Sequence, residues 1–129
     1  MKRRDAIRVI GSTAVLVTIL PELARAKKLA LGLDKVEQLK KVGGWVVLKI
    51  KGQEIMFIRE SEEVIRALDP ICTHKHCTVD YDPDEKLIVC PCHGSTYDLE
   101  GKVLKGPAKK PLTVYDAKLS DGKIIFSMD

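Results

Sequence analysis

Two short stretches decide the fold and the chemistry of this chain: Cys72-Thr73-His74-Lys75-His76-Cys77 and Cys90-Pro91-Cys92-His93-Gly94-Ser95. The first contains the pattern C-x-H, and the second contains C-x-x-H after a gap of 15 residues, 75–89. Each stretch therefore offers one thiol and one imidazole, side chains that commonly bind transition metals. Cys77 and Cys92 add a second cysteine to each stretch, and a bond between them would tie the two together. The pattern predicts a metal centre built from two loops.

The ligand set suits a [2Fe–2S] cluster. Such a cluster can have two cysteines on one iron and two histidines on the other. Neutral imidazoles remove negative charge from the cluster, so its potential rises to about −150 to +300 mV, against about −400 mV for plant-type clusters held by cysteine alone. The second nitrogen of each ligand imidazole can also carry a proton that binds more tightly after reduction. These residues predict transfer of an electron together with a proton.

Other structures can be built from the same residues. Two cysteines and two histidines also form tetrahedral zinc sites, but the second pair of cysteines and the Gly-Ser-x-Tyr sequence at 94–97 would have no role there. Two plain disulfides with incidental histidines are another alternative. Cys77 and Cys92 would also be compatible with reduced, buried thiols. A coloured protein would favour the iron–sulfur cluster over these alternatives.

The two stretches closely resemble the cluster loops of Rieske iron–sulfur proteins, and Gly106-Pro107-Ala108 adds a third match. The resemblance runs from about Gly44 to the C-terminus and is most specific in the two loops. It implies one pair of ligands for each iron of a Rieske-type [2Fe–2S] cluster. These implied ligands are Cys72 with Cys90, and His74 with His93.

The resemblance also implies residues that stabilise and tune the cluster. It implies a disulfide between Cys77 and Cys92, as in the high-potential branch of the family, that of quinol-oxidising cytochrome complexes. It implies hydrogen bonds from Ser95 and Tyr97 to a bridging sulfide and to the first cysteine ligand, which would raise the potential further. The alternative for both hydroxyls is an ordinary turn or strand position. No residue of the chain is predicted to be catalytic.

The loops depart from the usual pattern of quinol-oxidising members at three positions. Lys75 and His76 stand where those members have an apolar residue and glycine. The methylene stem of Lys75 can still cover the cluster, but its charge lies at the docking tip. His76 is either a solvated loop side chain or a partner contact. Lys109 of the third loop stands where the family usually has another proline, and Gly106 and Pro107 of that loop are expected to contact the cluster loops.

The first 26 residues have the features of a targeting segment. Lys2-Arg3-Arg4 precedes an apolar run from Val9 to Leu20, and Ala24-Arg25-Ala26 fits a small-x-small cleavage site. The paired arginines resemble a twin-arginine export signal. A helix of twelve residues is about 18 Å long, while a bilayer core is about 30 Å thick. We expect a cleaved signal or an uncleaved membrane anchor, with a helix inside the domain as the alternative.

The net charge of +4 belongs mainly to that segment. Residues 1–26 contain five basic and two acidic side chains, so the remaining chain has a net charge of about +1. A nucleic-acid interface needs a clustered basic face, and the sequence predicts none.

The remainder is predicted to be all-β. Short apolar and β-branched runs separated by Gly and Pro turns indicate an antiparallel β-sandwich, with the cluster loops forming a small subdomain at one end. Residues 27–43 are expected to be a linker or hinge, or else an edge strand or surface turn, and 44–129 the cluster domain. The expected strands are 45–50, 54–59, 64–68, 87–89 and a final hairpin, 112–119 with 123–126.

These observations predict an electron-transfer subunit and not a complete enzyme. The first hypothesis is the Rieske subunit of a membrane cytochrome bc-type complex, on the outer (periplasmic) face of the cytoplasmic membrane. Its partners would be cytochrome b-type and c-type subunits, with quinol at the cluster tip. The alternatives are the small subunit of an exported molybdenum oxidase of the arsenite-oxidase type, and a stand-alone soluble periplasmic ferredoxin. A terminal dioxygenase would need a further catalytic domain.

Overall fold

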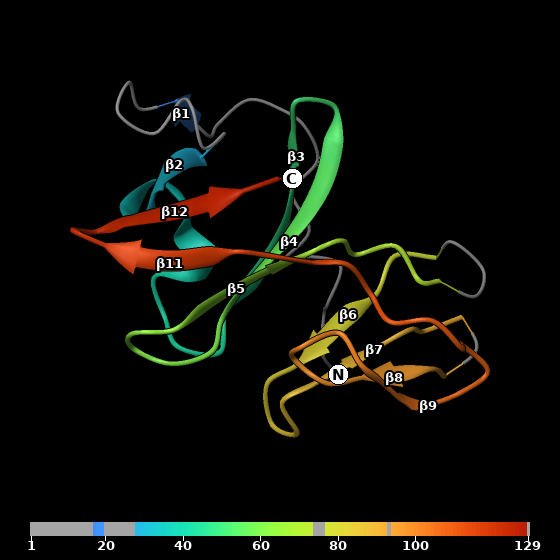
Figure 1. Cartoon of the computed structure of the whole chain (residues 1–129). Coiled ribbons are helices and arrows are strands. Elements are labelled where there is room, and N and C mark those ends of the chain that lie inside the picture. Colours follow the sequence, from blue (N-terminus) through green and yellow to red (C-terminus); the bar gives the residue numbers. More distant parts are fainter. Residues whose placement is uncertain (1–16, 20–27, 74–76, 93, 129) are drawn as a thin grey trace.

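The computed structural model describes residues 17–19, 28–73, 77–92 and 94–128. They form three antiparallel four-stranded sheets and two short 3-10 helices (Figure 1). The all-β antiparallel fold predicted from the sequence is therefore confirmed. The first sheet has the order β1 (Val17–Ile19), β2 (Lys28–Gly32), β12 (Lys123–Ser127), β11 (Ala117–Ser120); the second β10 (Val114–Tyr115), β5 (Ile65–Leu68), β4 (Gln53–Arg59), β3 (Trp45–Ile50); the third β6 (Asp80–Asp82), β7 (Leu87–Val89), β8 (Thr96–Tyr97), β9 (Val103–Lys105).

The second sheet is buried on both faces and separates two apolar cores. Side chains alternate between the faces of a strand, so Val46 and Leu48 of β3 enter one core and Val47 enters the other. The first core lies between the first and second sheets, and the second lies between the second sheet and the third. Burial on both sides explains why β3 reads as an almost continuous apolar run, Trp-Val-Val-Leu-Lys-Ile.

The stretch 27–43 was predicted to be a linker or hinge, or else an edge strand or surface turn, and its described part, 28–43, packs largely into the first core. It contains β2, η3 (Leu33–Lys35) and η4 (Glu37–Leu39). β2 pairs with β12 over five residues, and Leu31 and Leu39 are fully buried. The gain from burying these side chains, about 1.5–3 kcal/mol each, holds the stretch in the domain. The strand β2 lies between β1 and β12 and not at the edge of its sheet.

The predicted N-terminal signal or anchor helix is not shown. Most of the segment lies outside the described residues, and the part that is described, Val17–Ile19, forms β1 and pairs with Leu29–Leu31 of β2. Among the described residues, no helix has the length and apolar character needed to cross a membrane.

The third sheet is the small subdomain that the sequence predicted (Figure 1). Its strands follow one another as a meander, β6-β7-β8-β9. The turns 83–86 and 98–102 therefore lie at one end of the sheet, and the loops 90–95 and 106–110 lie at the other. The first predicted cluster loop leaves β5 and returns into β6, so it approaches this second end as well. We refer to this end as the cluster end.

Candidate metal centre

Backbone hydrogen bonds close both predicted cluster loops in the same way. The N–H of Cys72 donates to the carbonyl of Cys77 at 2.6 Å, and the N–H of Cys90 donates to the carbonyl of Ser95 at 2.8 Å. In each loop the bond joins the cysteine to the residue five positions later. Gly94 has a φ of +80° in the second loop, a conformation that glycine adopts without steric cost. The two loops are thus held as compact turns, each beginning at a buried cysteine.

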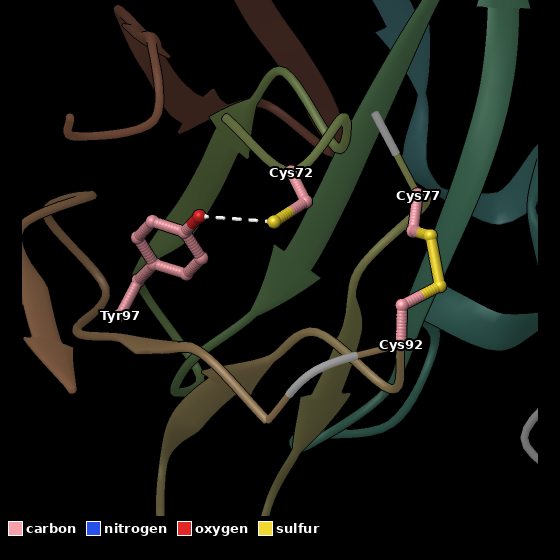
Figure 2. Close-up of a disulfide and its surroundings, with 4 residues drawn as sticks. All are labelled: Cys72, Cys77, Cys92 and Tyr97. Atoms are coloured by element: carbon pink, nitrogen blue, oxygen red, sulfur yellow. Dashed lines mark hydrogen bonds between the residues drawn. A yellow bond between two sulfur atoms is a disulfide. The ribbon is translucent and has the colours of Figure 1, made fainter. Parts of the chain in front are cut away.

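The four cysteines differ in their surroundings. Cys72 and Cys90 are 1% and 0% exposed and belong to the second core. Cys77 and Cys92 form a disulfide with an S–S distance of 1.98 Å (Figure 2). This is the pairing that the family resemblance implies. The sulfur atoms of Cys77, Cys90 and Cys92 lie within 4.8 Å of one another, so the disulfide lies directly beside the Cys90 thiol.

Tyr97 directs its hydroxyl at the Cys72 sulfur from β8, and the two atoms are 3.3 Å apart (Figure 2). The side chain is fully buried. Burial, followed by the hydrogen bond with Cys72, raises the pKa of Tyr97 above its ordinary value. The phenol therefore keeps its proton at neutral pH and remains a donor for a sulfur ligand.

Ser95 holds the third loop against the second. Its Oγ is fully buried and accepts a hydrogen bond from the N–H of Ala108 at 3.0 Å. A serine hydroxyl that accepts one bond still has its own hydrogen to donate. Ala108 follows the cis peptide bond between Gly106 and Pro107. These contacts bring the Gly-Pro-Ala sequence against the cluster loops.

Thr73 is a site residue that the sequence did not single out. Its hydroxyl donates to the carbonyl of Lys110 at 2.7 Å and lies 3.2 Å from the hydroxyl of Tyr97. Its N–H also donates to that tyrosine oxygen at 3.4 Å. Thr73 therefore links the first loop to the third and orients Tyr97. A threonine between two predicted ligands gives no sequence signal for such a role.

The predicted histidine ligands, His74 and His93, lie outside the described residues, and so do Lys75 and His76. The described residues fit an iron–sulfur cluster. Cys72 and Cys90 supply two buried thiols from separate loops, and the hydroxyl of Tyr97 is within hydrogen-bonding distance of the Cys72 sulfur. Thiolates are the iron ligands of such clusters, and hydrogen bonds to sulfur raise their potential.

The fold and the two closed loops define a small all-β, cluster-binding domain. A family model for the Rieske [2Fe-2S] domain matches residues 31–116. The chain belongs to the Rieske [2Fe-2S] domain family, and its cofactor is a [2Fe–2S] cluster.

Known relatives are consistent with this assignment. The chain is 39% identical over 80 residues to the cytochrome b6-f complex iron-sulfur subunit of Trichodesmium erythraeum, a match that covers 60% of this chain and 45% of that protein. The chain thus spans about half the length of the curated relatives it matches. Two solved structures are similar, each with a TM-score of 0.57. The plasma membrane Rieske protein PetC3 from Synechocystis PCC 6803 is 26% identical, over 89% of this chain and 99% of that one, and a chain of a hyperthermophilic respiratory Complex III is 27% identical, over 74% and 71%.

Proposed function

We propose that the protein is the electron-transfer subunit of a membrane quinol-oxidising complex of the cytochrome bc or b6-f type. The observation that carries the proposal is the hydrogen bond of Tyr97 to Cys72 in a core that also contains Cys90. The disulfide beside Cys90 supports it. The similarity to a cytochrome b6-f complex iron-sulfur subunit and to a chain of a respiratory Complex III supports it as well. The protein would be one carrier within the complex and would not be a complete enzyme alone.

In this proposal, Cys72 and Cys90 bind one iron, and His74 and His93 bind the other. A bound [2Fe–2S] cluster supplies one-electron transfer. The second ring nitrogen of a histidine ligand holds the proton that quinol loses with its electron. Tyr97 and Ser95 hold hydroxyl groups against the centre. Cys77 and Cys92 keep the two loops together.

The proposed location is the outer face of the cytoplasmic membrane, reached by twin-arginine export. The basic start of the chain and the apolar run 9–20 support it. We propose that the segment 1–26 either anchors the domain or is removed after export. The partners would be a cytochrome b-type subunit, which provides the quinol pocket, and a c-type cytochrome, which receives the electron.

The ligand assignment is tested by exchanging histidines one at a time. The purified chain should be coloured and, when reduced, give a rhombic EPR signal. The variants His74→Ala and His93→Ala should lose or change that signal. His76→Ala is the matched control, because it removes an imidazole from the same loop and should leave the signal intact. A colourless protein that contains zinc would refute the cluster.

The quinol-oxidising role is tested by gentle detergent purification from native membranes. A b-type haem that co-purifies with the cluster protein is the expected result. Protein free of b haem, in the soluble fraction and with a new N-terminus near Lys27, would contradict the role.

A second candidate is an exported carrier outside a quinol-oxidising complex, such as the small subunit of a molybdenum oxidase or a soluble ferredoxin. The charge of Lys75 in the first cluster sequence favours it, because quinol-oxidising members usually have an apolar residue at that position. Molybdenum in the purified soluble fraction would identify the protein as the small subunit of a molybdenum oxidase. A soluble fraction without molybdenum would identify it as a ferredoxin.

A further inference from the structure

Three lysines beside the candidate metal centre have no acidic partner in the described part of the chain. Lys105 ends β9, and Lys109 and Lys110 follow in the third loop; all three are exposed. None of them forms an ion pair with any of the described residues. We call these three residues the lysine patch. Three unpaired cations within six residues of chain produce a local positive field.

The meander places the acidic side chains of the subdomain at the end opposite this patch. Asp82, Asp84 and Glu85 lie in or beside the turn 83–86, and Asp98 and Glu100 lie in the turn 98–102. By contrast, the segments 71–79, 90–97 and 103–110 contain four lysines and no Asp or Glu. Asp80, which follows the first loop, is buried. The cluster end is therefore electropositive even though the chain beyond residue 26 is almost neutral.

Hydrogen bonds attach the lysine patch directly to the cluster loops. The Lys110 carbonyl accepts from Thr73 in the first loop, and the Ala108 N–H donates to Ser95 in the second. The charged side chains therefore project from a loop that is fixed to both halves of the centre. Figure 1 shows β9 beside β8, and the chain after β9 turns round the end of the third sheet before it runs back toward β11.

An exposed apolar side chain adjoins the patch. Leu104 is 55% exposed, the largest exposure among the described large hydrophobic residues. Protein interfaces combine an apolar contact with a polar rim, and complementary charge increases the rate of association. Leu104, which immediately precedes Lys105 in β9, and the exposed lysines together have this composition. A partner that exchanges electrons with the centre must approach this end of the domain.

We propose that the lysine patch, with Leu104, is a docking surface for an acidic face of the protein that exchanges electrons with this domain. This inference rests on the proposed electron-transfer function and adds the charge of the partner to it. The attraction is long-ranged, with a Debye length of about 30 Å at 0.01 M salt and about 3 Å at 1 M. It should therefore act on the rate of encounter and disappear at high salt.

The test uses two partners that differ in charge alone. The full chain is reduced and mixed in a stopped-flow instrument with cytochrome c or with succinylated cytochrome c, in which acylation makes the basic surface acidic. In each reaction one electron leaves the protein, and one ferric haem becomes ferrous. At about 0.01 M salt we expect the acidic form to react about tenfold faster, within the range known for electrostatic steering, and the difference should vanish at about 1 M salt.

Two variants with equal charge separate the patch from net charge. The triple variant K105Q/K109Q/K110Q should lose most of the preference for the acidic form. The control triple variant K49Q/K118Q/K123Q removes three exposed lysines from the first and second sheets and should keep it. The midpoint potential of each variant is measured, so that rates are compared at equal driving force.

Each outcome has a defined meaning. If the full chain has no cluster, the proposed function fails and this inference fails with it. If the cluster is intact but the full chain shows no preference, or both variants behave alike, the docking inference alone is overturned. Equal rates with the two cytochromes, together with patch-dependent sedimentation on phosphatidylglycerol vesicles, would assign the patch to lipid and also overturn it.

Discussion

Removal of the Tyr97 hydroxyl should lower the reduction potential of the centre. In Tyr97→Phe the ring can remain in the second core, but the hydrogen bond to the Cys72 sulfur, 3.3 Å long, is lost. A donor at this sulfur stabilises the reduced, more electron-rich state more than the oxidised one. The hydroxyl is also shared with Thr73, so we take an ordinary net hydrogen bond, about 0.5–1.5 kcal/mol. With about 1.4 kcal/mol equal to about 59 mV for one electron, the expected decrease is about 20–60 mV.

The measurement is a redox titration followed by EPR or visible absorbance. The matched control is Tyr115→Phe, which also removes one tyrosine hydroxyl. The ring of Tyr115 belongs to the first core, and its hydroxyl accepts a hydrogen bond from Gln53. That variant should keep the potential of the unaltered protein. An unchanged or higher potential in Tyr97→Phe, with the cluster fully bound, would refute the reasoning.

Three further predictions concern neighbouring features. Thr73→Val removes an acceptor that competes for the Tyr97 hydrogen, so the potential should rise by an amount of the same order, about 20–60 mV; a decrease in the same redox titration would show that Thr73 acts chiefly by holding Tyr97 in place. Cys77→Ser opens a loop with a sequence separation of 15 and should lower the free energy of unfolding by about 3 kcal/mol, measured in denaturant, and equal stability in the variant would contradict this. Burial, followed by nearby carboxylates, raises the pKa of Tyr81 and Tyr115. A raised pKa means that the folded state holds its protons longer, so the stabilisation is complete below about pH 10 and is lost as the pH rises through the folded-state values. Tyrosinate absorbance should thus appear at higher pH in folded protein than in urea, and coincident titrations would exclude the shift.

The sequence predicted those strands whose pattern is local. β3 and β4 are apolar runs on either side of the Lys51-Gly52 turn, and the structure has them within one residue of the predicted bounds. β8 and β9 contain two and three residues, which is too short for any periodicity to appear. The strand β2 was not predicted for another reason. Its lysine-rich surroundings suggested a linker, and its partner β12 comes from the far end of the chain.

The sequence likewise predicted some residues of the candidate site and missed others. Side chains that act through their own chemistry, such as the cysteines and Tyr97, belong to a recognisable motif. The contacts of Thr73 and Ala108 use a backbone carbonyl or N–H, and such groups are present at every residue. The lysine patch could not be predicted from the sequence. Its charges are separated from the acidic turns only by the order of the strands in the third sheet.

The two cores explain how tuning and docking can be kept apart in so small a domain. Cys72 and Cys90 belong to the second core, where low polarity strengthens a hydrogen bond such as that of Tyr97. Charged groups would be costly among the apolar side chains of that core. The third loop crosses this boundary, because Ala108 is buried against Ser95 while Lys109 and Lys110 are exposed to solvent. Substitution of those lysines should therefore change which partner binds while leaving the hydrogen bonds around the centre in place.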